Sequence, residues 1–324
     1  MAHPPPAPQF TLRGSGAQVN TLHFCCKDPD PPLLFSGSSK GAVHIWNLTT
    51  RRAERVLEGH GGASVIWLST LNSRNTLISQ GRDMQVCTWD LSGGRCSVTD
   101  SFLTGSVGFC QCSLLETQPG RWLLAHPAAA MEEVSIVDVP SKTLVCSLKA
   151  DANRGMLMCV KLWQPDSGQG PLLLAGYEDG SLTLWDVSQR KPLSRLAAHP
   201  QPVMCFDFDP VKLRGISGSS ERAVISWTLD GQQSLQLQDS VQLVNAGVSH
   251  LRIREDRKIV ASAGWDHRIR LFGWKRLKPL AVLQHHTDMV LCVAFSDHRD
   301  PCRRVMAAGS KDQRISLWSV YNEG

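Results

Sequence analysis

The chain lacks the sequence features of membrane proteins, of secreted proteins and of several common enzyme classes. It has no run of about 18 apolar residues, the length that a helix needs to cross a bilayer. The first nine residues, which include four prolines, lack the basic start and apolar core of a signal peptide. The patterns GxxxxGK[ST], GxGxxG after a strand, HExxH and GxSxG are also missing. We therefore expect a non-enzymatic protein of the cytoplasm, the nucleus or both, with no catalytic residue, no cofactor and no membrane contact.

Pairs of metal-binding motifs are missing as well, although cysteine is plentiful. The chain has eleven cysteines, an odd number, and most of them lie in predicted strands, where a small apolar side chain packs well. Cys25-Cys26 and the Cys110 to Cys112 pair have no CxxC or CxxH partner at the spacing of a zinc site. We expect reduced, buried cysteines and no bound metal.

What the sequence does contain is a sevenfold repeat. The hexapeptide LTLWDV at 182–187 recurs in degenerate form, and the tryptophan position of each copy lies 42 to 48 residues after the previous one. This spacing is close to the period of about 40–45 residues that is typical of WD40 blades. The seven positions are Trp46, Trp89, Val137, Trp185, Trp227, Phe272 and Trp318.

Each period contains three apolar runs of strand length and a weaker fourth, separated by turn residues. The fold class that follows is all-β, a seven-bladed WD40 β-propeller of four-stranded antiparallel blades. The chain ends soon after the third strand of blade 7, and an additional strand, Phe10 to Arg13, precedes blade 1. We therefore predict that the N-terminal strand pairs with the last blade and closes the propeller. The predicted organisation is a Pro-rich disordered segment, 1–9, followed by one propeller domain, 10–324.

Polar residues recur beside the tryptophans in a pattern that predicts a buried hydrogen-bond network. In blade 2 the members are His60, Ser79, Asp83 and Trp89, which can link an indole to a hydroxyl, an imidazole and a carboxylate. The set is structural and not a catalytic triad, because its members satisfy one another. Blade 5 repeats the set with His199, Ser217, Glu221 and Trp227.

Blades 7 and 3 depart from this pattern. Blade 7 has His285 or His286, Asp312 and Trp318, but it has Ala308 where the hydroxyl is expected. Blade 3 lacks the tryptophan and the Gly-Asp turn, which the segment 126–133 replaces. That segment is either drift in a fold held by the other blades or a surface specific to a partner.

The turn after the second strand of each blade supplies the candidate partner-binding residues. Trp265 stands just before the turn residue Asp266, where other blades have hydrophilic residues. Its side chain is either exposed or folded over His267 or a neighbouring loop. Exposed tryptophan and arginine are typical of interaction hot spots. The candidate set is Trp265, His267, Lys311, Arg82 and Glu178.

Positive charge is concentrated in the last two blades. From Ala246 onward the chain has 14 Lys and Arg against 8 Asp and Glu, and the basic residues include Arg254 and Arg270. A basic sector suits an acidic protein surface or a nucleic acid. Because the aromatic residues are needed in the core and no base-reading module is present, we expect protein partners and regard nucleic acid as unlikely.

Four further strings, taken in this order, carry a family resemblance, namely 79–83, 176–181, 264–270 and 309–319. With them, the chain from about Pro8 onward resembles the guanine nucleotide-binding protein subunit beta-like family of WD40-repeat proteins, which is similar to ASTRA-associated protein 1. The resemblance implies a scaffold that acts with the Triple-T (ASTRA-type) cochaperone assembly in the maturation of phosphatidylinositol-3-kinase-like kinases. The alternative is a G-protein beta-like signalling subunit. No gamma-subunit coiled coil is expected, since only nine residues precede the first strand.

Overall fold

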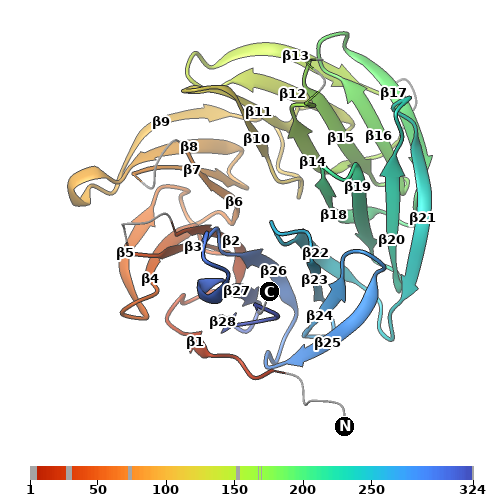
Figure 1. Cartoon of the computed structure of the whole chain (residues 1–324). Coiled ribbons are helices and arrows are strands. Elements are labelled where there is room, and N and C mark those ends of the chain that lie inside the picture. Colours follow the sequence, from red (N-terminus) through yellow and green to blue (C-terminus); the bar gives the residue numbers. More distant parts are fainter. Residues whose placement is uncertain are drawn as a thin grey trace. The chain divides into compact units, whose positions relative to one another are not determined.

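The structure is a computed structural model that describes residues 6–26, 31–71, 75–150, 154–166, 168 and 170–322. Residues 1–5 of the predicted disordered segment lie outside the described residues. Within the described part, the strands form seven four-stranded sheets (Figure 1). Within each sheet, strands that follow one another in the chain are neighbours and run antiparallel. The fold class is therefore the all-β, seven-bladed β-propeller that the repeat predicts.

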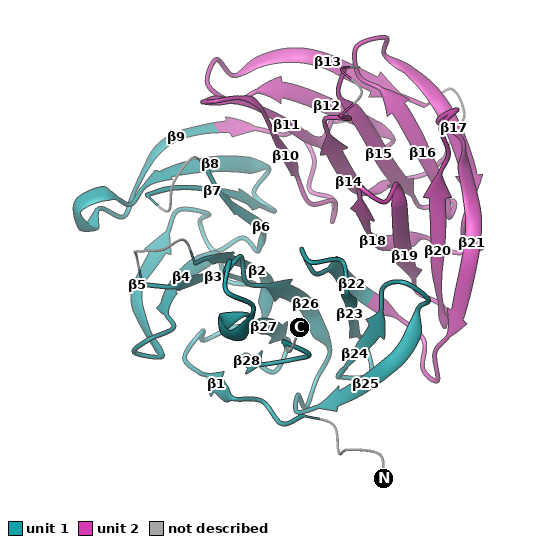
Figure 2. Cartoon of the chain, viewed as in Figure 1, with its two compact units in different colours: residues 1–101, 249–324 teal, residues 102–248 magenta. Residues whose placement is uncertain are grey.

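The chain divides into two compact units, coloured separately in Figure 2: unit 1 is 1–101 with 249–324, and unit 2 is 102–248. The expectation of one domain over 10–324 stays a prediction. Unit 1 contains blades 1, 2, 6 and 7. The strands of blade 1 are β2 (Val19–Cys25), β3 (Leu33–Ser38), β4 (Ala42–Asn47) and β5 (Arg52–Glu58). Those of blade 2 are β6 (Val65–Thr70), β7 (Thr76–Gly81), β8 (Gln85–Asp90) and β9 (Ser97–Leu103), the last of which ends in unit 2.

The other two blades of unit 1 come from the C-terminal part of the chain and from the first strand. Blade 6 consists of β22 (Val248–Ile253), β23 (Ile259–Gly264), β24 (Arg268–Gly273) and β25 (Lys278–Gln284). Blade 7 consists of β26 (Val290–Phe295), β27 (Met306–Ser310), β28 (Ile315–Trp318) and the N-terminal β1 (Phe10–Leu12). Two 3-10 turns, η1 (Ser92–Gly94) and η2 (Pro301–Arg303), lie in the connections.

Unit 2 contains blades 3, 4 and 5. Blade 3 consists of β10 (Ser113–Gln118), β11 (Arg121–Pro127), β12 (Glu133–Asp138) and β13 (Thr143–Lys149). Blade 4 consists of β14 (Leu157–Trp163), β15 (Leu172–Tyr177), β16 (Ser181–Asp186) and β17 (Lys191–Ala197). Blade 5 consists of β18 (Val203–Asp209), β19 (Arg214–Ser219), β20 (Ala223–Leu229) and β21 (Leu235–Gln242).

The N-terminal strand completes the last sheet, as the sequence predicts. β1 pairs antiparallel with β28, with Phe10 opposite Leu317 and Leu12 opposite Ile315. The pairing begins one residue before β1, where the Gln9 amide donates to the Leu317 carbonyl at 2.7 Å. Leu12 is buried in the apolar cluster that joins blades 7 and 1. Because β1 occupies the edge of β28, that edge does not present unpaired amides to other chains.

The repeated aromatic position lies at the same place in each blade. The five tryptophans at this position are almost completely buried, and Phe272 takes the same place in blade 6. In blades 1, 3, 4, 5 and 6 the register between the third and fourth strands shifts directly before this residue. Such a bulge bends the strand and re-aims its side chains. Apolar clusters between consecutive blades within each unit then bury the faces that a single sheet leaves open.

Candidate functional site

The polar network predicted for blade 2 is present and complete. The Trp89 Nε1–H donates to Ser79 Oγ at 2.8 Å, and Ser79 Oγ lies 2.8 Å from His60 Nε2. The other imidazole nitrogen, Nδ1, lies 3.0 Å from the Asp83 carboxylate. His60 and Ser79 are buried, and the serine hydroxyl is bonded to an indole. The three residues of a hydrolase triad are thus present, but the hydroxyl has no access to a substrate and the set holds Trp89 in place.

Antiparallel topology explains why these four residues meet. The first and second strands run in opposite directions, so the residues before β6 and the turn after β7 lie at the same end of the sheet. Gly81 lies between the two, and a Cβ atom at this position would collide with His60 and Asp83. The glycine therefore provides the space in which imidazole and carboxylate make contact.

Blade 7 has a complete network that could not be recognised from the sequence. His286, not His285, pairs with Asp312 at 3.0 Å, and its Nε2 lies 2.8 Å from Ser316 Oγ. The Trp318 indole donates to the same hydroxyl at 2.8 Å. Ser316 pairs with Ala308 across the two strands, so the hydroxyl has moved to the neighbouring strand and still lies between imidazole and indole.

Blade 5 has only part of the predicted network, and the assignment of Glu221 to it is wrong. His199 Nε2 lies 2.9 Å from Ser217 Oγ. In the described part of the chain, however, the buried His199 Nδ1 and Trp227 Nε1 have no hydrogen-bond partner. The Trp227 ring stacks on Phe208, with 5.6 Å between the ring centroids, and this packing sets its orientation. Burial lowers the pKa of His199 to about 4, so the imidazole is neutral at neutral pH.

Blades 4 and 6 replace the histidine with other side chains. In blade 6 the buried Arg270 forms a bidentate pair with Asp266, with Nη1 to Oδ1 at 3.0 Å. In blade 4 the buried Tyr177 occupies the position equivalent to Gly81. In the described residues, the buried Tyr177 hydroxyl and Trp185 indole have no hydrogen-bond partner, so blade 4 fills the turn end without a network of this kind.

The candidate partner-binding residues lie at this same end of their sheets. The amides of Arg82, Glu178 and Lys311 each donate to the carbonyl of the residue that precedes the first strand of the same blade, at 2.8 to 2.9 Å. Arg82, Trp265, His267 and Lys311 belong to unit 1, and Glu178 belongs to unit 2. Blades 6 and 7 share an apolar cluster, but no common site of all five residues is defined.

Four of the five candidates are exposed, and Trp265 is not. Arg82, Glu178, His267 and Lys311 are exposed, whereas Trp265 is half-buried. The indole is therefore not fully exposed, which favours the alternative that it folds over a neighbouring part of the surface. His267 has a φ of 58°, the left-handed conformation that Met84 and Gln313 adopt at the equivalent turn positions. The turn geometry thus accounts for its outward position.

Fewer of the basic residues of blades 6 and 7 are exposed than the sequence count implies. Arg254 is 3% exposed and donates to the carbonyls of Val320 and Tyr321, and Arg270 is buried against Asp266. The Asp256 carboxylate pairs with Arg254 and with Arg304. These arginines hold the C-terminal segment and a turn, so they do not contribute charge to a partner surface.

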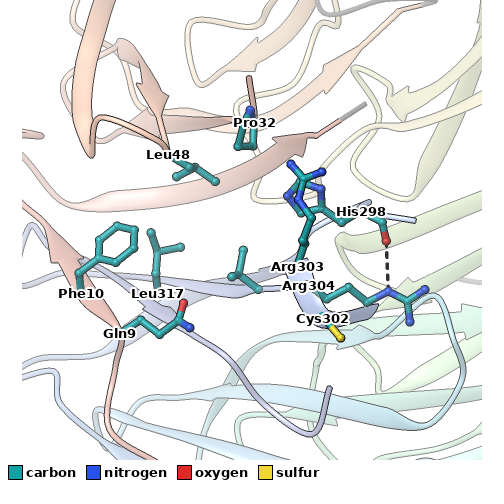
Figure 3. Close-up of a pocket in the computed structure, with 10 residues that line it drawn as sticks. Gln9, Phe10, Pro32, Leu48, His298, Cys302, Arg303, Arg304 and Leu317 are labelled. Atoms are coloured by element: carbon teal, nitrogen blue, oxygen red, sulfur yellow. Dashed lines mark hydrogen bonds between the residues drawn. The ribbon is translucent and has the colours of Figure 1, made fainter. Parts of the chain in front are cut away.

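A pocket of about 280 Å³ lies beside the N-terminal strand in unit 1, and no sequence pattern indicated it. Figure 3 shows Phe10, Leu48 and Leu317 on its apolar side and Arg303 next to His298 on the other. The Arg304 Nε–H donates to the His298 carbonyl at 3.2 Å and fixes this second wall. The volume of the pocket lies at the lower limit of small-molecule sites, which is about 300 Å³.

Exposed apolar side chains in blade 3 were also not expected from the sequence. Val107, Phe109 and Met131 are each more than half exposed. They stand in the loop before β10 and in the 126–133 segment. From the sequence alone, apolar residues in these loops are interpreted as core residues. Their exposure is therefore seen only in the structure.

Two classes of site find no support in the described residues. No group of three or more His, Cys, Asp or Glu side chains there has the arrangement needed to hold a metal ion. Across the same residues, no helix has the length and apolar character required to span a bilayer.

Comparison with known proteins places these features in a family. The model described as WD domain, G-beta repeat matches residues 6–47 and 277–319. The chain is 54% identical to the mouse guanine nucleotide-binding protein subunit beta-like protein 1, with 98% of this chain and 97% of the mouse protein covered. It is 27% identical to ASTRA-associated protein 1 of Verticillium alfalfae, over 98% of this chain and 93% of that protein. It is 25% identical to ASTRA-associated protein 1 of Schizosaccharomyces pombe, over 98% and 99%. The chain therefore belongs to the guanine nucleotide-binding protein subunit beta-like protein 1 family of WD40-repeat proteins.

Proposed function

We propose that this WD40 scaffold acts with a Triple-T (ASTRA-type) cochaperone assembly in the maturation of phosphatidylinositol-3-kinase-like kinases, in the cytoplasm, the nucleus or both. The observation that carries the proposal is the end-to-end similarity to proteins named for association with ASTRA. The alignments cover 98% of this chain and 93% and 99% of the two fungal proteins. A partial match would reflect only the repeat, but alignment over the whole length also includes the turns and termini.

The physical character of the chain fits a scaffold. Blades locked by buried networks provide rigid turns, and a rigid surface loses little conformational entropy when a partner binds. The Ser-His-Asp set of blade 2 is occupied by Trp89, and we propose that the protein has no catalytic activity of its own. Exposed charges of both signs at the turn ends, Arg82 and Lys311 against Glu178, suit protein partners.

Affinity purification of the tagged full-length chain from cells, followed by mass spectrometry, tests the proposal. We expect recovery of cochaperone components of the Triple-T type and of phosphatidylinositol-3-kinase-like kinases, and lower kinase levels after depletion of the chain. Recovery of gamma subunits without cochaperones would favour the alternative, a G-protein beta-like signalling subunit. Imaging of the tagged chain tests the location, and accumulation outside the cytoplasm and nucleus would contradict that part.

A further inference from the structure

Two loops and the start of β14 meet at one surface of unit 2. A Cβ atom at Gly105 would lie 3.3 Å from the Ala129 Cβ, and one at Gly108 would lie 3.9 Å from the Met156 Sδ. The Leu157 amide donates to the Met131 carbonyl at 2.8 Å. The loop before β10, the 126–133 segment and Met156 are therefore in contact.

The side chains on this surface are apolar and exposed to an unusual degree. Val107 is 54% exposed, Phe109 58% and Met131 63%. With the half-buried Met156 they form what we call the blade 3 patch, defined as Val107, Phe109, Met131 and Met156. Large apolar side chains gathered in water are unfavourable for a protein that acts alone and mark interaction sites. Methionine adapts its shape to different apolar partners, which suits such a surface.

The loops that carry the patch are held by their own hydrogen bonds. The Gly108 amide donates to Ser106 Oγ at 3.2 Å, and the Thr104 hydroxyl donates to the Ser106 carbonyl at 3.4 Å. In the other loop, the Ala128 amide donates to the Glu133 carbonyl at 3.0 Å. These bonds hold the loop backbone in place before a partner binds, so binding orders few additional groups.

Acidic groups border the patch. The exposed Glu178 accepts a hydrogen bond from the Met156 amide through Oε2 at 2.9 Å. Glu132 follows Met131 directly, and its contact with Lys149 is a weak surface pair of 3.7 Å. The nearby Arg154 turns toward the blade, where it donates to Thr183 and lies over the Tyr177 ring. Unit 2 as a whole has 11 Lys and Arg against 14 Asp and Glu.

We propose that the blade 3 patch binds a segment of a partner protein that presents apolar side chains flanked by lysine or arginine. The apolar centre supplies the buried contact, and the acidic border selects the charge of the flanking residues. The proposal rests on the scaffold function above, to which it adds the place and chemistry of one partner contact.

Fluorescence anisotropy with the full-length chain tests this proposal. The probe is a labelled 18-residue peptide of leucine and lysine with an amphipathic pattern, and the comparison peptides replace lysine with glutamate or leucine with serine. We expect binding of the leucine–lysine peptide alone, at least tenfold weaker in Phe109→Ser and in Glu178→Lys. Leu237→Ser, which alters a similarly exposed apolar residue on β21 of blade 5, is the matched control and should bind like the wild type.

The outcomes separate this proposal from its alternatives. Equal affinity of wild type, Phe109→Ser and Leu237→Ser, with melting temperatures unchanged, would overturn it. Preference for the leucine–glutamate peptide would also overturn it. If sedimentation shows self-association that Phe109→Ser abolishes, the occupant is a second copy of this chain and the partner proposal fails.

Failure of the blade 3 patch proposal can be distinguished from failure of the proposed scaffold function. A photo-crosslinker at position 109 in cells should capture a segment with lysine or arginine beside apolar residues, whereas one at position 237 should not. Normal cochaperone recovery by Phe109→Ser without such a crosslink would leave the scaffold function intact and overturn the patch. A crosslinked segment of this chemistry without any cochaperone would do the reverse.

Discussion

Unit 1 and unit 2 use the same blade architecture but differ in how the turn ends are stabilised. In unit 1, blades 2 and 7 contain complete indole–hydroxyl–imidazole–carboxylate networks, and blade 6 has the buried Arg270–Asp266 pair. In unit 2, blade 5 leaves two buried nitrogens without partners, and blade 3 exposes apolar side chains. The difference suggests that unit 1 gives rigidity, while unit 2 displays surface features that packing does not require.

The two units also differ in net charge. Unit 1 has 23 Lys and Arg against 15 Asp and Glu, and unit 2 has 11 against 14. Two unit 1 arginines, Arg254 and Arg270, are buried in ion pairs, so the excess charge of unit 1 overstates what a partner meets. Unit 2 is mildly acidic, and two of its acidic residues, Glu132 and Glu178, border the blade 3 patch.

The largest expected effect comes from removing the strand that completes blade 7. Deletion of residues 1–15 removes β1 and the buried Leu12, and it exposes the edge of β28. We expect aggregated protein in size-exclusion chromatography, because an unpaired edge strand recruits other chains. Deletion of residues 1–7 is the control and should leave a soluble chain. A monodisperse 1–15 deletion with unchanged melting would show that β1 does not hold unit 1 together.

Removing the buried serine hydroxyl of blade 7 should have the next largest effect, and placing a serine on the neighbouring strand should reverse part of it. Ser316→Ala leaves the buried Trp318 indole and His286 imidazole without their shared partner, at a cost of roughly 1–3 kcal/mol in unfolding free energy. Ala308→Ser added to Ser316→Ala places a hydroxyl on the paired position of β27, where blade 2 has Ser79. We expect the double variant to recover part of the loss in chemical denaturation. No recovery would mean that the two positions are not equivalent.

Acidification should weaken unit 2 through His199. Its pKa in the folded state is about 4, below the ordinary value of 6.5, so the unfolded chain binds the proton more readily as pH falls. Stability from the neutral imidazole is therefore present above pH 6.5 and is lost as the pH falls toward 4. We expect a loss of about 1 kcal/mol between pH 7 and pH 5.5. Denaturation of His199→Gln across this range should lack this component, and an identical pH dependence would contradict the assignment.

The smallest expected effect concerns the exposed turn charge of blade 7. Lys311 lies 3.9 Å from Asp288, and both side chains are 43% exposed, so the pair adds little stability. Lys311→Glu should leave the melting temperature unchanged and reduce partner recovery slightly, less at high salt, because exposed charges are screened over about 8–10 Å. Lys278→Glu, on the exposed β25, is the control. Equal recovery by both variants at low salt would remove Lys311 from the candidate site.

The repeated elements of this chain could be predicted from the sequence, and the substitutions within them could not. Periodic tryptophans and their spacing identify the blades, and His60, Ser79 and Asp83 identify one network, because each residue falls at its usual offset. Ser316 was missed since its equivalence to position 308 depends on cross-strand register. Glu221 was misassigned because it stands at the offset that Asp83 has in blade 2, whereas in the structure its amide donates to Ser219 Oγ and His199 Nδ1 has no partner among the described residues.

In the candidate site too, positions set by local geometry could be predicted from the sequence, and contacts set by the tertiary structure could not. Turn positions such as Arg82, His267 and Lys311 follow from local geometry, and all three are exposed. Trp265 is half-buried. Arg254 pairs with Asp256 and donates to the Val320 carbonyl, which is distant in sequence, and Arg270 pairs with Asp266 across a turn. The blade 3 patch depends on the contact of two loops with Met156, which no single stretch of sequence encodes.

The most direct test of this contrast compares His60→Ala with His199→Ala by hydrogen exchange and mass spectrometry. In blade 2 the substitution leaves Ser79 and Asp83 without the imidazole, whereas in blade 5 only the Ser217 contact is lost. We predict that the opening free energy of β7 falls by roughly 2–3 kcal/mol in His60→Ala, and that the change for β19 in His199→Ala is less than half of this. Equal losses in the two blades, or a larger loss in blade 5, would contradict the account that complete networks stabilise unit 1 and that unit 2 lacks them.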